Sequence, residues 1–562
     1  MAQNNPYINQ PYTNQPNIPD TNNVAPHGND SVRTPYASQA GTYVSKREDT
    51  VYTKTMKEHF SFFGIGSLLY SVFFTFCLYK NSSGITYPFF VIGTLCYFFF
   101  STQKLGVPYK KDNIFYIISI VLLGISNCLT NSEQILAMNK CGIFLLAFIL
   151  MLHTFYQNKD WNFPKYFCAL GQTIGTAFIC VFRPISDMIF YFDTQKKIKT
   201  GKKSYFLPIL IGIVIMIPTL LFVTILLASA DAVFADIFSR ILKAVNLETI
   251  FGTFFMTLVV FFASYAFCAA FSMKEVKEET ADHRFLEPII AIIVTAALSV
   301  IYLLFSVIQI LYLFIGNMQL PEGYTYSSYA REGFFQLLAV CILNLMIVLI
   351  CLYLFRENIA LKIILTIISG CTFIMIASSA LRMIMYINRY NLTFLRIFVL
   401  WSLAVIFLLM AGVTISIYMN KFPLFIYSMV IVTVFYIGLS FSHPDYWIAR
   451  YNLDPEHIEY LNDYDVNDSK KYLRKLSADA APILLDKNSN PYLAAMPVGF
   501  YSDELEDNTD NRTENYDKDD ILKEYSWLYK YYGKIKDLSN DMHIRNFNFS
   551  VYTAEKYIDK LQ

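Results

Sequence analysis

Long runs of apolar residues, separated by short polar loops, fill the chain between residues 56 and 441. A helix that spans a bilayer needs about 20 mostly apolar residues. Runs close to that length lie at 60–79, 87–101, 114–130, 135–156, 206–228, 250–271, 288–315, 334–355, 360–387, 397–418 and 422–441. The pattern therefore predicts an all-α, polytopic membrane protein with about eleven transmembrane helices and a small helical C-terminal tail domain.

Composition agrees with a membrane protein and separates the first part of the chain from the rest. Charged residues make up only 16% of the sequence, against roughly 25% in a soluble domain. Residues 1–55 are rich in Asn, Gln, Pro and Thr, and such a segment buries too little apolar surface to offset the entropy lost on ordering. We therefore expect a disordered N-terminal segment over residues 1–55, followed by a transmembrane domain over residues 56–441.

The C-terminal part, residues 442–562, holds 23 Asp or Glu against 15 Lys or Arg. Its apolar residues between Ile521 and Leu538 recur every three or four positions, which is typical of one face of a helix. A second helix is expected near 469–476, with Asp468 or Ser469 as its N-cap. These features predict an acidic, mainly helical, soluble domain.

Lys and Arg are concentrated in alternate loops, which indicates the orientation of the spans. If the N-terminus is cytoplasmic, this bias follows the positive-inside rule along the chain. An odd number of spans then places the C-terminus outside the cell membrane. One element does not fit simply, because 166–182 is apolar but is followed by Arg183, Pro184 and Asp187. We interpret it as a re-entrant or interfacial cytoplasmic element; if it spans instead, every later element inverts and the tail lies inside.

Several stretches resemble a known family. They are LLASADAVFADIF (226–238), GYTYSSYAREGFFQL (323–337), ALRMIMYINRYNLTFLR (380–396), HPDYWIARYNL (443–453) and YLRKLSADAAPILL (472–485). In these stretches the chain is similar to a family of bacterial membrane proteins catalogued as the domain of unknown function 4173 family. The resemblance covers about Leu105 to Gln562 and implies a polytopic bacterial membrane protein of uncharacterised function. It brings no established catalytic residues.

Five charged residues form a candidate polar cluster on the outer side: Asp231, Asp236, Arg331, Glu332 and Arg382. The two aspartates begin an expected amphipathic helix, where they could form a cation or proton site or simply favour the helix N-terminus. A charge inside a span, such as Arg382, is a functional-site hypothesis by default. Pairing with Asp231 or Glu332 would satisfy it, and snorkelling to the headgroups is the alternative.

No cofactor and no metal are expected. The acidic stretch 463–468 begins like a calcium loop but lacks the required Gly and Glu at the positions that Asp468 and Arg474 occupy. His443, Asp445 and His457 have no ligand periodicity, so we interpret them as part of a linker where the chain leaves the membrane.

Function is constrained less than architecture. Catalytic signatures such as GxSxG, the P-loop and HExxH are absent, and no basic patch with interleaved aromatics indicates nucleic acid. The leading hypothesis is a non-enzymatic sensing or scaffolding protein of the cell envelope, whose partners are the lipid bilayer and an envelope or extracellular protein that binds the acidic tail. A transporter or channel is the first alternative. An enzyme on a lipid-linked substrate, with Asp231 or Asp236 as acid–base group, is the second.

Overall fold

The computed structural model describes most of the chain from residue 49 onward. The residues outside the description are 1–48, 82, 159–160, 199–211, 213–215, 217–218, 221, 225, 232, 235, 237–239, 241–246, 280–283, 312–325, 420, 497–517 and 562. Helices make up nearly all of the regular structure in the described part, which confirms the all-α prediction.

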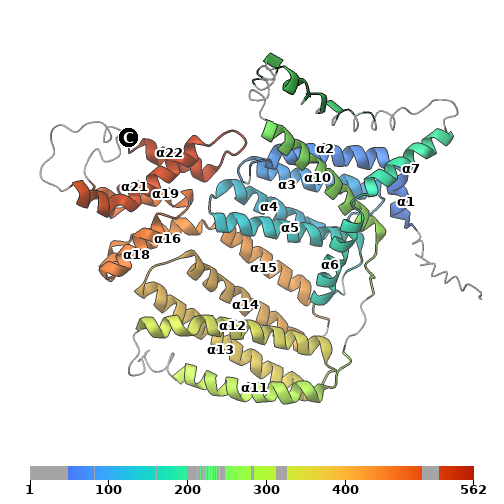
Figure 1. Cartoon of the computed structure of the whole chain (residues 1–562). Helices are drawn as coiled ribbons and strands as arrows, with labels where there is room; N and C mark the ends of the chain where they lie inside the picture. The colour runs from blue at the N-terminus through green and yellow to red at the C-terminus, as the bar shows by residue number, and fades with distance from the viewer. Residues whose placement is uncertain are drawn as a thin grey trace, which may run out of the picture. The chain divides into compact units, whose positions relative to one another are not determined.

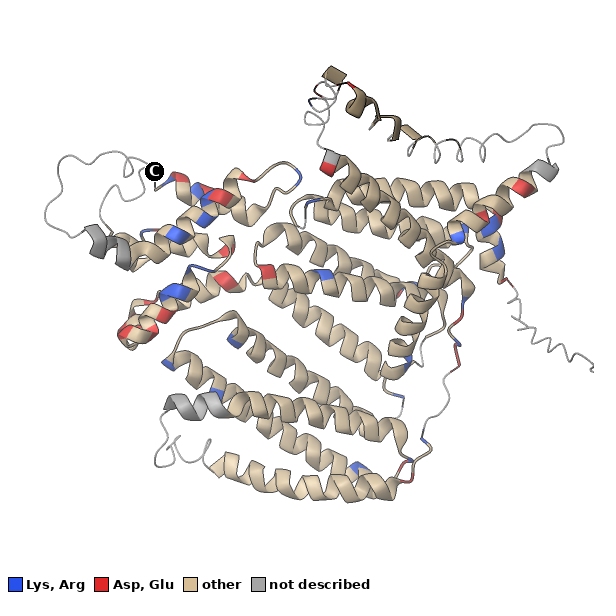
Figure 2. Ribbon diagram, in the orientation of Figure 1, with Lys and Arg blue, Asp and Glu red and all other residues tan. Residues whose placement is uncertain are grey.

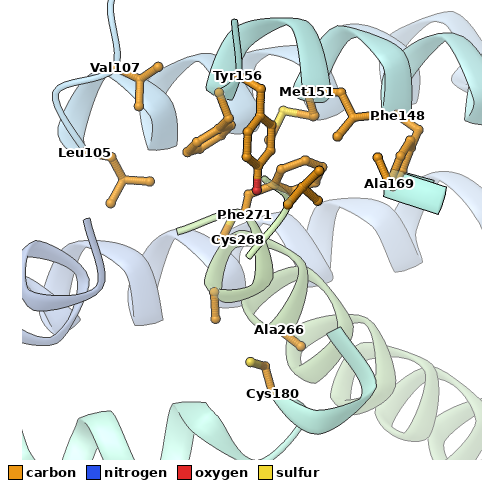
Figure 3. Close-up of a cluster of buried hydrophobic side chains, with 14 of the residues drawn as sticks. Leu105, Val107, Phe148, Met151, Tyr156, Ala169, Cys180, Ala266, Cys268 and Phe271 are labelled. Atoms are coloured by element: carbon orange, nitrogen blue, oxygen red, sulfur yellow. The ribbon is translucent and has the colours of Figure 1, made fainter. Parts of the chain in front are cut away.

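The first group of helices, which we call bundle A, includes those that form the aromatic core shown in Figure 3. Its members are α1 (Val51–Glu58), α2 (Phe60–Leu78), α3 (Thr86–Lys104), α4 (Asn113–Leu129), α5 (Glu133–Phe155), α6 (Phe163–Ile179), α7 (Arg183–Ile198) and α10 (Leu247–Met273). Phe271 of α10 stacks on Phe155 of α5 with ring centroids 5.3 Å apart. Stacked and edge-on aromatic pairs add specific geometry to apolar burial, so they fix how α5 and α10 cross.

The second group, bundle B, consists of α11 (Pro288–Gln309), α12 (Tyr326–Leu354), α13 (Ile359–Arg389) and α14 (Phe394–Tyr418). Sequence signals set its helix ends. Pro288 occupies the first turn of α11, where its missing N–H is not needed, and the Asn358 side chain caps α13 by accepting from Ala360 N at 2.8 Å. In Figure 1 these helices lie together as one group.

The last of the long apolar helices, α15 (Leu424–Phe441), joins bundle A although it follows bundle B in the chain. Polar side chains hold it there. Asn139 Oδ1 on α5 accepts from the hydroxyls of Tyr436 at 2.6 Å and Ser440 at 2.8 Å, and Ser126 on α4 hydrogen-bonds Ser440 at 2.6 Å. Such interhelical hydrogen bonds stabilise packing in a bilayer, where the hydrophobic effect does not drive helices together. Because α15 also packs against α14, the two bundles meet along these two helices.

Eight of the helices within the described residues are long and apolar enough to cross a bilayer: α2, α5, α10, α11, α12, α13, α14 and α15. Helix α4 is apolar but has 17 residues, and α6 and α7 form a pair bent by 58°. The expected span 206–228 lies largely outside the described residues. The chain is thus a multi-pass membrane protein, while the number eleven stays a prediction. Figure 2 shows the long helices almost free of charge along their middles.

The loops gather on two faces of the helices. Loops 79–86, 129–133 and 389–394 contact the C-terminal part of the chain, and we call this side the tail face. On the other side, the far face, Thr50 Oγ1 donates to Ser272 O at 2.6 Å and Lys110 Nζ to Tyr156 O at 2.7 Å. Loops must alternate between two faces in this way if consecutive helices cross the bilayer in opposite directions.

The C-terminal part of the chain, residues 442–562, which we call the tail domain, has several short helices and one long helix around a cluster of buried apolar residues. They are α16 (Pro444–Asn452), α17 (Pro455–Glu459), α18 (Asp463–Leu473), η2 (Ala478–Ala480), α19 (Ala481–Leu484), α20 (Pro491–Ala494), α21 (Lys518–Asn540) and α22 (Phe549–Asp559). The amphipathic pattern of 521–538 coincides with α21. The expected N-cap of the earlier helix was wrong: α18 starts sooner, where the Asn462 side chain accepts from Asp465 N at 2.8 Å.

Candidate functional site

The two aspartates of the expected outer cluster make local contacts. Asp231 Oδ1 accepts from Val233 N at 2.7 Å and Phe234 N at 3.1 Å, so its carboxylate caps the turn that follows. Asp236 forms an ion pair with Arg240 at 2.9 Å, four residues along the chain, and both side chains are exposed. The contacts of Asp231 are those expected of helix N-terminus chemistry, whereas Asp236 makes an ion pair within one turn. The outer polar cluster as a whole stays a prediction.

Arg382 lies inside bundle B with only 8% of its surface exposed. Its Nη2 donates to Gln309 Oε1 of α11 at 3.1 Å, and Ser378 Oγ donates to the same oxygen at 2.6 Å. A Cβ on Gly333 of α12 would lie 2.0 Å from Arg382 Nη1, so the guanidinium occupies the space that a side chain would need. Arg382 therefore connects three helices and does not snorkel freely.

Arg331 and Glu332 belong to α12, which begins at Tyr326. Their side chains lie outside the described part of the structure, so the pairing of Glu332 with Arg382 stays a prediction. The close approach of the neighbouring Gly333 to Arg382 places the backbone of this turn beside the guanidinium.

Arg183 and Asp187, expected in the cytoplasmic re-entrant element, come together on α7. Arg183 Nε lies 3.5 Å from Asp187 Oδ1, and Tyr265 of α10 donates its hydroxyl to Asp187 Oδ2 at 3.0 Å. Arg183 Nη2 also lies 3.4 Å from Asp49, which in turn pairs with Lys57 of α1. Asp187 is 2% exposed, so its charge is compensated by a cation and a hydroxyl, as a buried carboxylate requires.

A buried aspartate that the sequence did not single out joins the tail domain to the transmembrane helices. Asp479 accepts from Asn131 N at 2.9 Å and from the hydroxyls of Thr130 and Ser550. His443 Nδ1 approaches Asp479 Oδ2 at 3.3 Å, and the Asp479 side chain is 0% exposed. We call these five residues the tail junction. They bring together the α4–α5 loop, the exit of α15 and two separate parts of the tail domain.

Where the chain leaves α15, the backbone is strained and the pKa values of two side chains are raised. His443 adopts φ +48°, a left-handed conformation that costs a non-glycine residue about 1–2 kcal/mol. Its hydrogen bond to Asp479 raises the pKa of the imidazole, against the opposing effect of burial. Burial raises the pKa of Asp445, whose Oδ2 accepts from Ser477 N at 3.1 Å. The linker interpretation of His443 and Asp445 was therefore incomplete, because His443 belongs to the junction and Asp445 is held beside it by Ser477.

The tail domain also contacts the tail face of bundle A at the α2–α3 loop. Arg545 Nη2 donates to Tyr79 O at 2.6 Å, and Ile85 N donates to Phe547 O at 2.8 Å. Gly84 has φ +100°, and a Cβ there would lie 2.6 Å from the Asn546 carbonyl carbon. Only glycine allows this backbone conformation and this close approach.

Bundle B is held through the α13–α14 loop. The Asn452 side chain forms a pair of hydrogen bonds with the backbone of Leu392, accepting at 2.7 Å and donating at 2.9 Å. Asn391 Nδ2 donates to Asp465 O at 3.2 Å, and Phe394 N donates to the Tyr472 hydroxyl at 2.9 Å. The tail domain thus contacts both bundles on the same face.

Chemically, the junction is suited to holding parts together. Asp479 is surrounded by four donors and closed to solvent, which leaves it no access to a substrate. Within the described residues no group of His, Cys, Asp and Glu could hold a metal ion. The signal available in the sequence was the SADAAPILL stretch (477–485), whose polar residues interrupt an otherwise apolar helical segment.

Comparison with protein families gives one match. The family described as "Domain of unknown function (DUF4153)" matches residues 117–486, more than half of the 562-residue chain. This range runs from α4 through the Asp479 stretch and leaves α21 and α22 outside. Curated proteins gave no match, and neither did solved structures. The family of unknown function expected from the sequence bore a different number, and by this match the chain belongs to the DUF4153 family.

Proposed function

We propose that this protein senses or scaffolds in the membrane by coupling the arrangement of its two helix bundles to its tail domain. The observation that carries the proposal is the double attachment of the tail domain, to loops 79–86 and 129–133 of bundle A and to loop 389–394 of bundle B. If the tail domain is rigid and fixed to both bundles, it transmits a displacement of one bundle to the other.

The character of the contacts supports this function over catalysis. Asp479 and Asn452 are buried and surrounded by hydrogen-bond partners, so each favours one docked geometry. A network of this kind resists partial opening, since every broken contact leaves a buried polar group unsatisfied. A partner that binds the acidic tail could thus alter the packing of the bundles.

We further propose that the far face is cytoplasmic and the tail face is outside. Far-face loops carry many cations, namely Lys104, Lys110, Lys111, Lys165, Lys274, Lys277, Arg284, Arg356, Lys362 and Lys421, whereas the described tail-face loops of the bundles carry Lys80, Arg389 and Arg396. The positive-inside rule favours the richer face for the cytoplasm. The contacts of α6 and α7 with Asp49, Glu275 and Phe425 lie on the far face, which supports the re-entrant interpretation.

The coupling is tested by measuring the distance between the bundles. Spin labels at Lys111 of bundle A and Ile359 of bundle B, both exposed on the far face, report the inter-bundle distance by pulsed electron resonance. The exposed Cys96, Cys141 and Cys168 are first replaced by Ser. We expect Asp479→Ala to broaden the distance distribution although it lies on the opposite face. The matched control Asp559→Ala, at an exposed position on α22, should leave it unchanged. Identical distributions for all three proteins contradict the proposal.

A transport function is the second candidate, favoured by the bent pair α6–α7 with Asp187 inside it. Broken helices with a buried ionisable residue line substrate paths in many transporters. Its test is a proton or cation flux assay in vesicles with Asp187→Asn. A flux present in the native protein and lost in this variant would support it, and no flux in the native protein would count against it.

A further inference from the structure

An apolar groove of about 720 Å³ lies where the two bundles meet. Its walls are Leu400 and Trp401 of α14 and Val434 and Gly438 of α15, and Trp447 of α16 lies at one end. The volume falls within the roughly 300–1,000 Å³ of typical ligand pockets. Trp401 closes the floor on one side, because its indole N–H donates to Phe435 O at 2.9 Å.

The depth of the groove determines what can reach it. Both walls belong to membrane-spanning helices and the wall residue Val434 is 51% exposed, so we infer that the open side faces the hydrocarbon of the bilayer. Along α15 it extends from Val434 to Ser442, which is about 12 Å at 1.5 Å per residue. One leaflet contributes half of a hydrocarbon core of about 30 Å. The groove therefore follows most of one leaflet, the leaflet on the tail face.

The end of the groove on the tail face has the chemistry of a headgroup region. Trp447 is 53% exposed there, and an amphipathic indole suits the boundary between hydrocarbon and water. Arg450 is exposed and follows Trp447 by three residues, so the two side chains share one side of α16. A guanidinium at this level complements a phosphate.

We propose that the groove binds one acyl chain of a bilayer phospholipid, with the lipid phosphate near Arg450. The chain would fill the space between the bundles beneath the tail domain. Three independent observations support a lipid as the occupant. The walls are apolar and lie at bilayer depth, the groove is nearly as long as one leaflet is thick, and Trp447 and Arg450 lie at the level of the headgroups. The proposal does not depend on the coupling function.

Gly438 offers a way to block the site without disturbing the fold. A Cβ at Gly438 would contact nothing within 4 Å, so Gly438→Phe extends into the groove. The matched control is Gly370→Phe on α13, since Gly370 is also exposed on a span and also has open space at its Cβ.

The experiment uses the full chain in vesicles of phosphatidylethanolamine and phosphatidylglycerol that contain phosphatidylglycerol with a diazirine on its acyl chain. After irradiation, mass spectrometry maps the adducts. We expect adducts on 397–401 and 434–438 to exceed those around Gly370 in the native protein. Gly438→Phe should lower groove adducts roughly tenfold, which corresponds to about 1.4 kcal/mol of binding free energy, and Gly370→Phe should not.

Two results would overturn the proposal. Equal adduct densities in the groove and around Gly370 of the native protein would mean ordinary contact with the bilayer, whatever the variants do. Unchanged groove adducts in a correctly folded Gly438→Phe protein, as judged by gel filtration, would show that the chain lies elsewhere. Arg450→Gln adds the headgroup test: it should reduce the excess of labelling by the phosphatidylglycerol probe over a phosphatidylethanolamine probe.

Discussion

Replacing Asp479 tests the energetic importance of the tail junction. Asp479→Ala removes the acceptor of four donors while the hydroxyls of Thr130 and Ser550 stay buried. A buried donor left unsatisfied costs about 1–3 kcal/mol, and breaking a buried charged network typically costs about 3–5 kcal/mol in total. The contribution of His443 is smaller than that of the other partners, since 37% of its side chain is exposed and solvent screens it. We expect a loss of about 3–4 kcal/mol.

Asp479→Asn should be milder for a reason that the geometry provides. With the amide nitrogen in the place of Oδ2, it can donate to the Thr130 hydroxyl and to neutral His443, while the remaining oxygen still accepts from Asn131 N and Ser550. Only the charge and its stronger hydrogen bonds are lost, which amounts to about 1–2 kcal/mol.

Hydrogen exchange followed by mass spectrometry, on the full chain in nanodiscs, measures both losses as local opening. Because each 1.4 kcal/mol is a factor of ten, peptides that cover 130–132 and 548–551 should exchange roughly several hundredfold faster in Asp479→Ala. In Asp479→Asn the increase should be about tenfold. Asp559→Ala is the control for removal of an exposed acid. If Asp479→Ala exchanges like the native protein, or if Asn is as damaging as Ala, the hydrogen-bond reasoning is wrong.

Three further predictions follow from other contacts. Because the folded-state pKa of His443 is raised, its contribution to tail docking should be complete below about pH 6.5 and should decrease as the pH rises through the raised pKa. The pKa of Asp445 is also raised, and it acts in the same direction at lower pH. In a pH series of urea unfolding followed by tryptophan fluorescence, His443→Gln should flatten the dependence of stability on pH. Gly333→Ala should destabilise bundle B by about 1–3 kcal/mol, because the new Cβ would clash with Arg382 Nη1. In the Arg382→Ala background the clash is absent, so thermal unfolding should show that Gly333→Ala then costs little stability. A cysteine at the exposed Lys487 should react with a membrane-impermeant maleimide in intact cells, and labelling only after lysis would place the tail face in the cytoplasm.

The spans could be predicted from the sequence because the bilayer imposes a length. Apolar runs such as 135–156 and 397–418 have one stable solution in hydrocarbon, a helix with all its backbone groups paired, and they correspond to α5 and α14. The presence of Arg382 in an apolar run was likewise enough to predict a polar contact, since a charge there needs partners. Its partner Gln309 could not be identified, because nothing in the sequence says which helices adjoin α13.

The tail junction could not be predicted either, because the sequence does not show that its distant segments are neighbours. Asp479 and Thr130 are 349 residues apart, and Asp479 and Ser550 are 71 apart. Helical periodicity describes the residues within one element, whereas this site forms where a loop of the transmembrane part meets two distant parts of the tail domain. The aspartates at 231 and 236 are easier to find because they stand close together at an expected helix start, and that start accounts for the contacts of Asp231.

The return of α15 to bundle A has a consequence for biosynthesis. Asn139 enters the bilayer long before Tyr436 and Ser440 have been translated, with sequence separations of 297 and 301 residues. At synthesis rates of about 5–20 residues per second, that interval is roughly 15–60 s. During this time the nascent chain carries an incompletely satisfied polar face in hydrocarbon. The insertion machinery or a membrane chaperone must then shield α4 and α5 until the last span emerges, and chains that terminate before residue 424 should be targets for membrane proteases.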